Sequence, residues 1–305
     1  MRSNFAWSVR MTSVDKRLRS SEPAAPPLSW ARQDVEQRLF FPGARHTRVN
    51  NWLAASLGLA LAISFYAVLY FAVRGSEFAK MFTELGVIPF VIVFFACWSI
   101  AILFIKWRKL SLQRRALRYE VVPRENDFVL SAATVDQVIE RIYTIADDPK
   151  RFLLYNRIIV ALANLKNLGR VSDLDEIFNT QAENDESASE TSYAVLGGCV
   201  WGIPVLGFIG TVLGLSHAIG GFGAVLQSAG ADMSAIKTEL VAVTGGLSLA
   251  FVTTLQALVA AFGIQLTSTF LKKSEQEFLD DCKRYCMSQI VNRLRIMPFE
   301  RGAEK

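Results

Sequence analysis

Two apolar stretches decide the fold of this chain: IPVLGFIGTVLGLSHAIGGFG from Ile203 to Gly223 and VTGGLSLAFVTTLQALVAAFG from Val243 to Gly263. Each has 21 residues, and about 20 apolar residues in a helix cross the hydrocarbon layer of a membrane. Both stretches are also rich in Gly, Ala, Ser and Thr. Small residues let a second helix approach closely, which a helix surrounded only by lipid does not need. The stretches therefore predict two membrane helices in close contact with other helices.

Two further apolar stretches precede this pair. Trp52–Val73 and Leu85–Ile105 carry no charged residue over 22 and 21 positions. The chain has 305 residues, of which 51% are hydrophobic, and its mean hydropathy of +0.28 is high for a soluble protein. Because no useful length of sequence alternates with the period of a strand, we predict an all-α integral membrane protein. It has four transmembrane helices, a helical cytoplasmic domain and extended cytoplasmic helices. The charge-free run Leu240–Leu271 is longer than one span requires. We therefore expect its last part, around Gln265–Thr269, to emerge into water.

The basic residues predict the orientation. Nine Lys or Arg lie in the first fifty positions, and others follow the second and fourth spans, namely Lys106, Arg108, Lys109, Arg114, Arg115, Arg118, Lys272, Lys273, Lys283 and Arg284. The links on the other side carry only Arg74, Lys80 and Lys237. Basic segments stay in the cytoplasm, so both termini and residues 107–192 are predicted to be cytoplasmic. The net charge of +5 is then a topology signal, and we predict no nucleic-acid partner.

The same pattern divides the chain into five parts. They are a cytoplasmic tail (1–50), transmembrane helices 1 and 2 (51–106), a helical cytoplasmic domain (107–192), transmembrane helices 3 and 4 (193–272), and a cytoplasmic C-terminal helix and tail (273–305). Within the tail, SWARQDVEQRLFF from Ser29 is predicted either to lie on the membrane as an amphipathic helix or to form a short polar helix. Seven acidic residues between Asp173 and Glu190 form either a solvated helix face or a dock for a basic partner.

The sequence gives no sign of an enzyme. It has no P-loop, HExxH or GxSxG motif, and its four cysteines lack the neighbouring Cys or His residues of a metal site. We predict no catalytic residue, no metal and no cofactor, and we interpret the cysteines as small apolar fillers.

Small residues follow one face of each of the last two spans. At helical spacing the third span presents Pro204, Gly207, Thr211, Gly214 and Ala218, with Gly210 completing a GxxxG pair, and the fourth presents Gly246, Ala250, Thr254, Ala257 and Ala261. Such stripes support two interpretations. They are common in ordinary helix packing, and a membrane Thr often bonds only its own helix. From the stripes alone, packing is the favoured interpretation. They can also line a narrow space that admits a third helix.

None of the four spans contains Asp, Glu, Lys or Arg. A proton relay through hydrocarbon usually needs a titratable group at depth. If protons cross here, another chain must supply that group, and Thr211 and Thr254 would help to solvate it. Ser248 adds a hydroxyl to the fourth span. His217, near the outer end of the third, is either an entry group for protons or an anchor at the headgroups.

These residues resemble a known family. Pro204, Gly207, GTVLG (Gly210–Gly214) and TTLQALVAAFG (Thr253–Gly263) are similar to the MotA/TolQ/ExbB proton-channel family over residues 195–272. The four spans resemble the MotA branch, whereas the threonines of GTVLG and of position 254 resemble the TolQ/ExbB branch.

The resemblance implies a complex in the bacterial inner membrane. Five copies of this chain would surround two copies of a single-span MotB/ExbD/TolR-like partner that carries a membrane Asp. Protons would pass that Asp beside Thr211 and Thr254, and their movement would drive mechanical work. The residues leave two alternatives open, a membrane scaffold that oligomerises without conduction and a solute transporter, although the inverted repeats of a transporter are not visible.

Overall fold

The computed structural model describes residues 26–38, 43–44, 46–72, 76–83, 86–122, 130, 134–168, 173–227 and 233–293. Over these ranges the chain is all-helical, and four helices are long and apolar enough to cross a membrane. The prediction of an all-α protein with four such helices is confirmed. The described residues contain no strand, and an isolated bridge joins Leu28 and Ala146.

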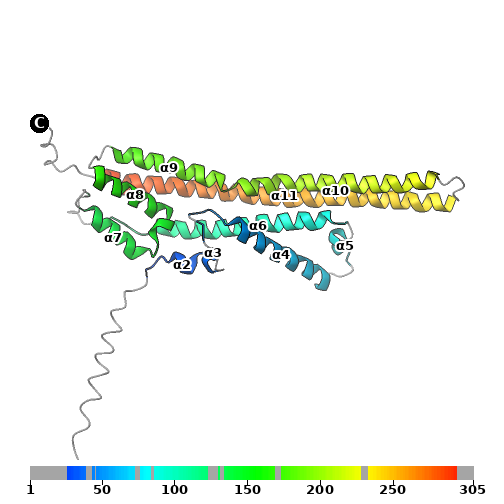
Figure 1. Cartoon of the computed structure of the whole chain (residues 1–305), viewed down its shortest axis with the longest axis horizontal. Helices are drawn as coiled ribbons and strands as arrows, with labels where there is room; N and C mark the ends of the chain where they lie inside the picture. The colour runs from blue at the N-terminus through cyan, green and yellow to red at the C-terminus, as the bar shows by residue number, and fades with distance from the viewer. Residues whose placement is uncertain are drawn as a thin grey trace, which may run out of the picture.

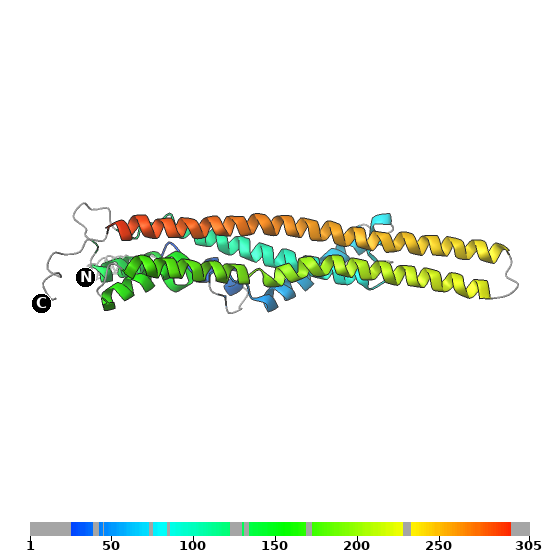
Figure 2. The same ribbon diagram turned by 90° about the horizontal axis from the view of Figure 1, so that it is seen from above.

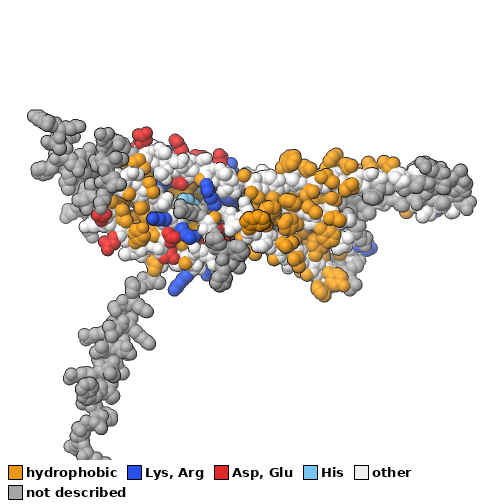
Figure 3. Space-filling view, viewed as in Figure 1, with side chains coloured by type: hydrophobic (Ala, Val, Ile, Leu, Met, Phe, Trp, Pro, Cys, Tyr) orange, Lys and Arg blue, Asp and Glu red, His pale blue; other side chains and the backbone are white. Residues whose placement is uncertain are grey.

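The four long helices lie roughly side by side (Figures 1 and 2). They are α4 (Asn51–Ala72), α6 (Ile88–Ala116), α10 (Ala194–Gln227) and α11 (Met233–Gln289), with the short α5 (Glu77–Thr83) between α4 and α6. The longest, α11, has 57 residues and therefore a length of about 85 Å. It connects the apolar half of the molecule to the half where charged side chains gather (Figure 3).

The charged half contains a compact helical unit, which we call the basal domain. It consists of α7 (Val135–Ile145), η1 (Pro149–Arg151), α8 (Leu153–Leu168), α9 (Asp173–Thr191) and η2 (Val291–Arg293), packed on the adjoining ends of α6 and α11. Cys282 and Cys286 of α11 are fully buried in its core. Two of the acidic residues of α9 are paired within the chain: Asp185 accepts from Arg157 (2.7 Å) and Glu190 from Lys272 (3.2 Å).

The N-terminal segment packs into the basal domain through α2 (Trp30–Gln33) and α3 (Val35–Arg38). The Trp30 side chain is 1% exposed and meets the Phe152 ring edge-on, with centroids 5.4 Å apart. The Asp147 carboxylate accepts from the Ser29 hydroxyl (2.7 Å) and the Trp30 amide (2.8 Å). Burial raises the pKa of Asp147, but these hydrogen bonds outweigh burial and leave the pKa lowered. The structure therefore places Trp30 in a protein core, while Leu39 and Phe40 lie outside the described residues.

Helix α4 packs mainly on α6. Gly58 lies against Trp98, where an added methyl group would be 2.6 Å from the Trp98 Cα. Farther along, the rings of Tyr66 and Phe90 stack with centroids 4.5 Å apart. Most other apolar side chains of α4 are exposed, as expected for a helix that faces lipid.

Contacts at two points fix the register of α6 against α10 and α11. At one end, Lys106 pairs with Glu275 of α11 at 3.1 Å. At the other end, Ile88 lies beside Gly210 of α10. These two points are 18 residues apart on α6, or about 27 Å, close to the thickness of the hydrocarbon layer.

The hairpin formed by α10 and α11 continues past the Ile88 end of α6 (Figures 1 and 2). From Gly210 to the end of α10 at Gln227 there are 17 more residues, about 25 Å. We call residues 211–227 and 233–252 the hairpin extension. We expected the surplus of the apolar run to emerge near Gln265–Thr269. In the structure Thr267 and Leu103 of α6 line the same groove, and the emergence near Gln265–Thr269 stays a prediction.

We expect Trp30→Ala to destabilise the purified protein by about 3–5 kcal/mol, because it empties a buried aromatic site. The matched control is Trp201→Ala, since Trp201 is 73% exposed. Thermal midpoints in detergent measure both variants. Equal shifts for the two tryptophans would contradict the core position of Trp30.

Candidate functional site

The small residues of α10 and α11 face each other within one chain. A methyl group added to Gly207 would lie 2.6 Å from the Ala257 Cβ, and one added to Gly214 would lie 3.0 Å from the Ala250 Cβ. At Gly246 the same addition would come within 3.0 Å of the Ala218 Cβ, and at Gly210 within 2.8 Å of the Thr253 Oγ1. We call this close contact the seam. Near its ends, Pro204 is partly buried inside α10 and Ala261 is buried on α11.

The threonines of the seam bond to backbone carbonyls. Thr254 donates across the seam to the Gly207 carbonyl at 2.9 Å. Thr211 donates to the Phe208 carbonyl of its own helix at 2.6 Å and is partly exposed. The carbonyls they use are consecutive in sequence, so the two hydroxyls lie at similar depth.

Sequence reasoning missed Thr253, which is buried in the seam and donates to Ala250 at 2.8 Å. The buried face of α11 runs through Ala250, Thr253, Ala257 and Ala261, so Thr254 stands at its edge. The signal was present, because 253 continues the spacing of three or four residues as well as 254 does. Periodicity alone cannot choose between two adjacent threonines.

Two predicted residues cannot be placed as side chains. His217 and Ser248 belong to α10 and α11 by their backbone positions, but their side chains lie outside the described part of the structure. Both positions fall in the hairpin extension. The charge-free segments 194–227 and 240–271 therefore offer the seam hydroxyls and carbonyls but no carboxylate or amine.

Charges appear at the other end of α6, in a buried group that we call the junction cluster: Thr47, Lys106, Tyr193 and Glu275. The Lys106 ammonium lies 3.1 Å from Glu275 and 4.0 Å from the Tyr193 ring centroid, and the Tyr193 hydroxyl donates to Glu275 at 2.7 Å. The Thr47 hydroxyl donates to the other carboxylate oxygen. Lys106 and Glu275 are 1% and 2% exposed, so each charge depends on the other for stabilisation.

A second buried ion pair lies one turn along α6. Lys109 and Glu36 are 2.7 Å apart, and both side chains are fully buried. Lys109 also donates to the Arg48 carbonyl at 2.7 Å, while Glu36 accepts from the amides of Ala44 (2.7 Å) and Asn50 (2.9 Å). This pair fixes the segment that precedes α4 on α6. Sequence reasoning treated both lysines only as topology signals, although the spacing of Lys106, Lys109 and Gln113 places them on one helical face.

Residues 153–283 match the family model described as the MotA/TolQ/ExbB proton channel family. This region is therefore similar to the MotA/TolQ/ExbB family, and it makes up less than half of the chain. This similarity supports a membrane proton-channel subunit in general terms. The matched region begins with α8 and contains α10, most of α11, the seam, and Tyr193 and Glu275 of the junction cluster. No curated protein and no solved structure matches the chain.

We expect Gly207→Leu to separate α10 from α11 and to destabilise the protein by about 1–3 kcal/mol, because a side chain there overlaps Ala257. The control is Gly202→Leu, since an added methyl group at Gly202 meets no atom within 4 Å. Thermal midpoints and a Cys cross-link between the helices measure the effect. A tolerated Gly207→Leu would show that the seam is not a close contact.

We expect Lys106→Met to cost about 3–5 kcal/mol, because it leaves the Glu275 carboxylate buried without its cation. Adding Glu275→Gln should recover much of this loss, since the amide oxygen still accepts from Tyr193 and no charge remains. The control Lys272→Met removes the exposed contact with Glu190 and should cost less than about 1 kcal/mol. Thermal midpoints of the three variants test this, and a double variant less stable than Lys106→Met alone would argue against the buried pair.

Proposed function

We propose that this chain forms the proton channel of an ion-driven motor or energy transducer in the bacterial inner membrane. Five copies surround two copies of a single-span, MotB/ExbD/TolR-like partner with an Asp in its membrane helix, and proton flow past that Asp does mechanical work. The observation that carries the proposal is the seam, which supplies hydroxyls but no carboxylate or amine. A proton pathway in hydrocarbon then needs its acid from another chain.

The seam hydroxyls suit such an acid chemically. Thr211 and Thr254 each donate their hydrogen to a backbone carbonyl, which leaves oxygen lone pairs free to accept. A protonated carboxylic acid is a donor, so these hydroxyls would stabilise the neutral Asp in the membrane. In this proposal Ser248 and His217 extend the pathway into the hairpin extension, and the small residues Pro204, Gly207, Gly210, Gly214, Gly246, Ala250, Ala257 and Ala261 form the face that lets helices approach.

The hairpin extension supports an assembly. It projects past α6 and exposes large apolar side chains on its described positions, among them Val212, Leu213, Ile219, Val241, Leu247 and Phe251. Contiguous apolar surface of this kind marks an interaction site. Neighbouring copies and the partner helices would cover it.

The position of the charges supports an orientation with both termini in the cytoplasm. Basic side chains gather on the basal domain and on the adjoining end of α6, away from the hairpin extension (Figure 3). In this orientation residues 107–192 form a cytoplasmic domain and residues 193–272 form the channel domain. One charge that crosses 100 mV releases about 2.3 kcal/mol, enough to bias a step between two helix arrangements.

The alternative is a scaffold that does not conduct. The same seam and exposed apolar faces would hold such a scaffold together. A small protein with one N-terminal span and an Asp inside it, encoded beside this chain, favours the channel, and its absence favours the scaffold.

We expect Thr254→Val to lower proton flux about tenfold in liposomes that contain the complete complex, because it removes one hydrogen bond in the pathway. Thr254→Ser keeps the hydroxyl and should restore flux. The control Thr269→Val removes an exposed hydroxyl that bonds only the Gln265 carbonyl of its own helix. Unchanged flux in an intact Thr254→Val complex would count against the proposed role.

A further inference from the structure

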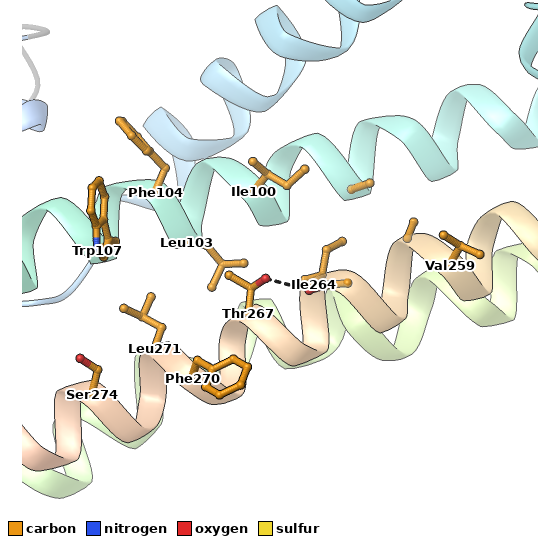
Figure 4. A pocket seen from close by; sticks show the side chains of 13 residues that line it. Ile100, Leu103, Phe104, Trp107, Val259, Ile264, Thr267, Phe270, Leu271 and Ser274 are labelled. Atoms are coloured by element: carbon orange, nitrogen blue, oxygen red, sulfur yellow. Dashed lines mark hydrogen bonds between the residues drawn. The ribbon is translucent and has the colours of Figure 1, made fainter.

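A long groove separates α6 from α11 on the apolar half of the molecule (Figure 4). Its volume is about 750 Å³, and its walls are almost entirely apolar, with Ile100, Phe104, Val259 and Phe270 among them. The one hydroxyl along its middle, that of Thr267, is satisfied because it donates to the Gly263 carbonyl at 2.8 Å. The groove therefore presents hydrocarbon to whatever occupies it.

One end of the groove opens into a basic recess of about 350 Å³. Trp107 and Ser274 line both, so the two depressions are continuous. The recess adds Arg114, Arg115 and Arg118 from α6 and no acidic residue among its described lining. We call it the arginine recess.

Neighbouring groups hold two of the arginines in place. Arg114 donates to the Ser274 carbonyl at 2.7 Å and to its hydroxyl at 2.9 Å, and it lies 3.8 Å from the exposed Glu277 carboxylate. Arg115 donates to Gln33 at 3.3 Å. These contacts leave other guanidinium donors available, since each guanidinium carries five.

The dimensions match one leaflet of a bilayer. The groove follows α6 from Ala96 to Trp107, 11 residues or about 16 Å, which is half the thickness of the hydrocarbon layer. Trp107 lies at the end where the apolar groove meets the recess and is exposed, as is typical of tryptophan at a membrane interface. The recess is therefore at the level of the lipid headgroups.

We propose that the groove and the arginine recess together bind one anionic phospholipid. An acyl chain lies in the groove, and the phosphate contacts Arg114 and Arg118 with Ser111 beside them. A helix of a neighbouring copy could fill the groove but would supply no anion for the three arginines. Free phosphate could bind the arginines but would leave the apolar groove empty. Only the assignment to the cytoplasmic leaflet rests on the proposed function.

The test is native mass spectrometry of the purified oligomer taken from nanodiscs of equal phosphatidylglycerol and phosphatidylcholine. We expect phosphatidylglycerol to be retained in preference. Arg114→Gln/Arg118→Gln should lower that preference about 30-fold, because each basic residue at an anionic surface contributes about fivefold. The control Arg108→Gln changes a basic residue of the same helix that lines neither depression.

A second variant fills the groove. An added methyl group at Gly263 meets no atom within 4 Å, so Gly263→Leu should occupy the groove without a clash and displace the lipid, whereas Gly202→Leu should not. Equal retention of the two lipids, or an unchanged preference in the double arginine variant, would overturn the proposal. So would a Gly263→Leu protein that loses its oligomer but keeps the lipid, since a neighbouring copy would then fill the groove. The readout needs no partner and no proton flux, so it stays distinct from failure of the proposed channel.

Discussion

The junction cluster is the constraint on which the rest of this structure depends. The charges of a buried lysine and a buried glutamate are stable only when they are paired. The contact between Lys106 and Glu275 therefore fixes the axial position of α6 along α11. Tyr193 and Thr47 donate to the same carboxylate, which adds the start of α10 and the segment before α4 to the same point. Four parts of the chain that are distant in sequence therefore share one register. Because the cluster is buried, a slip by one turn of any helix would leave a charge without compensation.

This register decides where the seam hydroxyls lie. Thr254 is 21 residues from Glu275 on an uninterrupted helix, or about 31 Å, which is the full thickness of the hydrocarbon layer. The seam threonines are thus far from the junction cluster along α11, and in the proposed channel a proton that enters from the opposite face would meet them first. No proline interrupts α11 between Met233 and Gln289, so a displacement at the seam reaches the basal domain through a rigid rod.

Local patterns in the sequence predicted the elements but not their long-range pairings. The lengths of the apolar runs identify four membrane helices because a bilayer sets that length. Trp30 looked equally suitable for a membrane surface, and only its contact with Phe152 places it in a core. Likewise, the sequence around Glu275 is typical of a solvated helix, and only the folded structure brings Lys106 beside it. The choice between Thr253 and Thr254 depends on a rotation of α11 by one residue, which the packing on Gly210 determines.

The distribution of charge has a mechanical consequence. This chain keeps its buried ion pairs at the junction with the basal domain and has no acid in the seam. An acid within the seam would change the contact between α10 and α11 of one subunit each time it took up a proton. An acid on a separate chain changes instead the contact between that chain and this one. A proton can drive relative movement only if the two arrangements differ in their interaction with the protonated group. In the proposed complex, a titratable group on the partner would direct that difference to the interface between chains and would leave the seam and the junction cluster as a rigid frame.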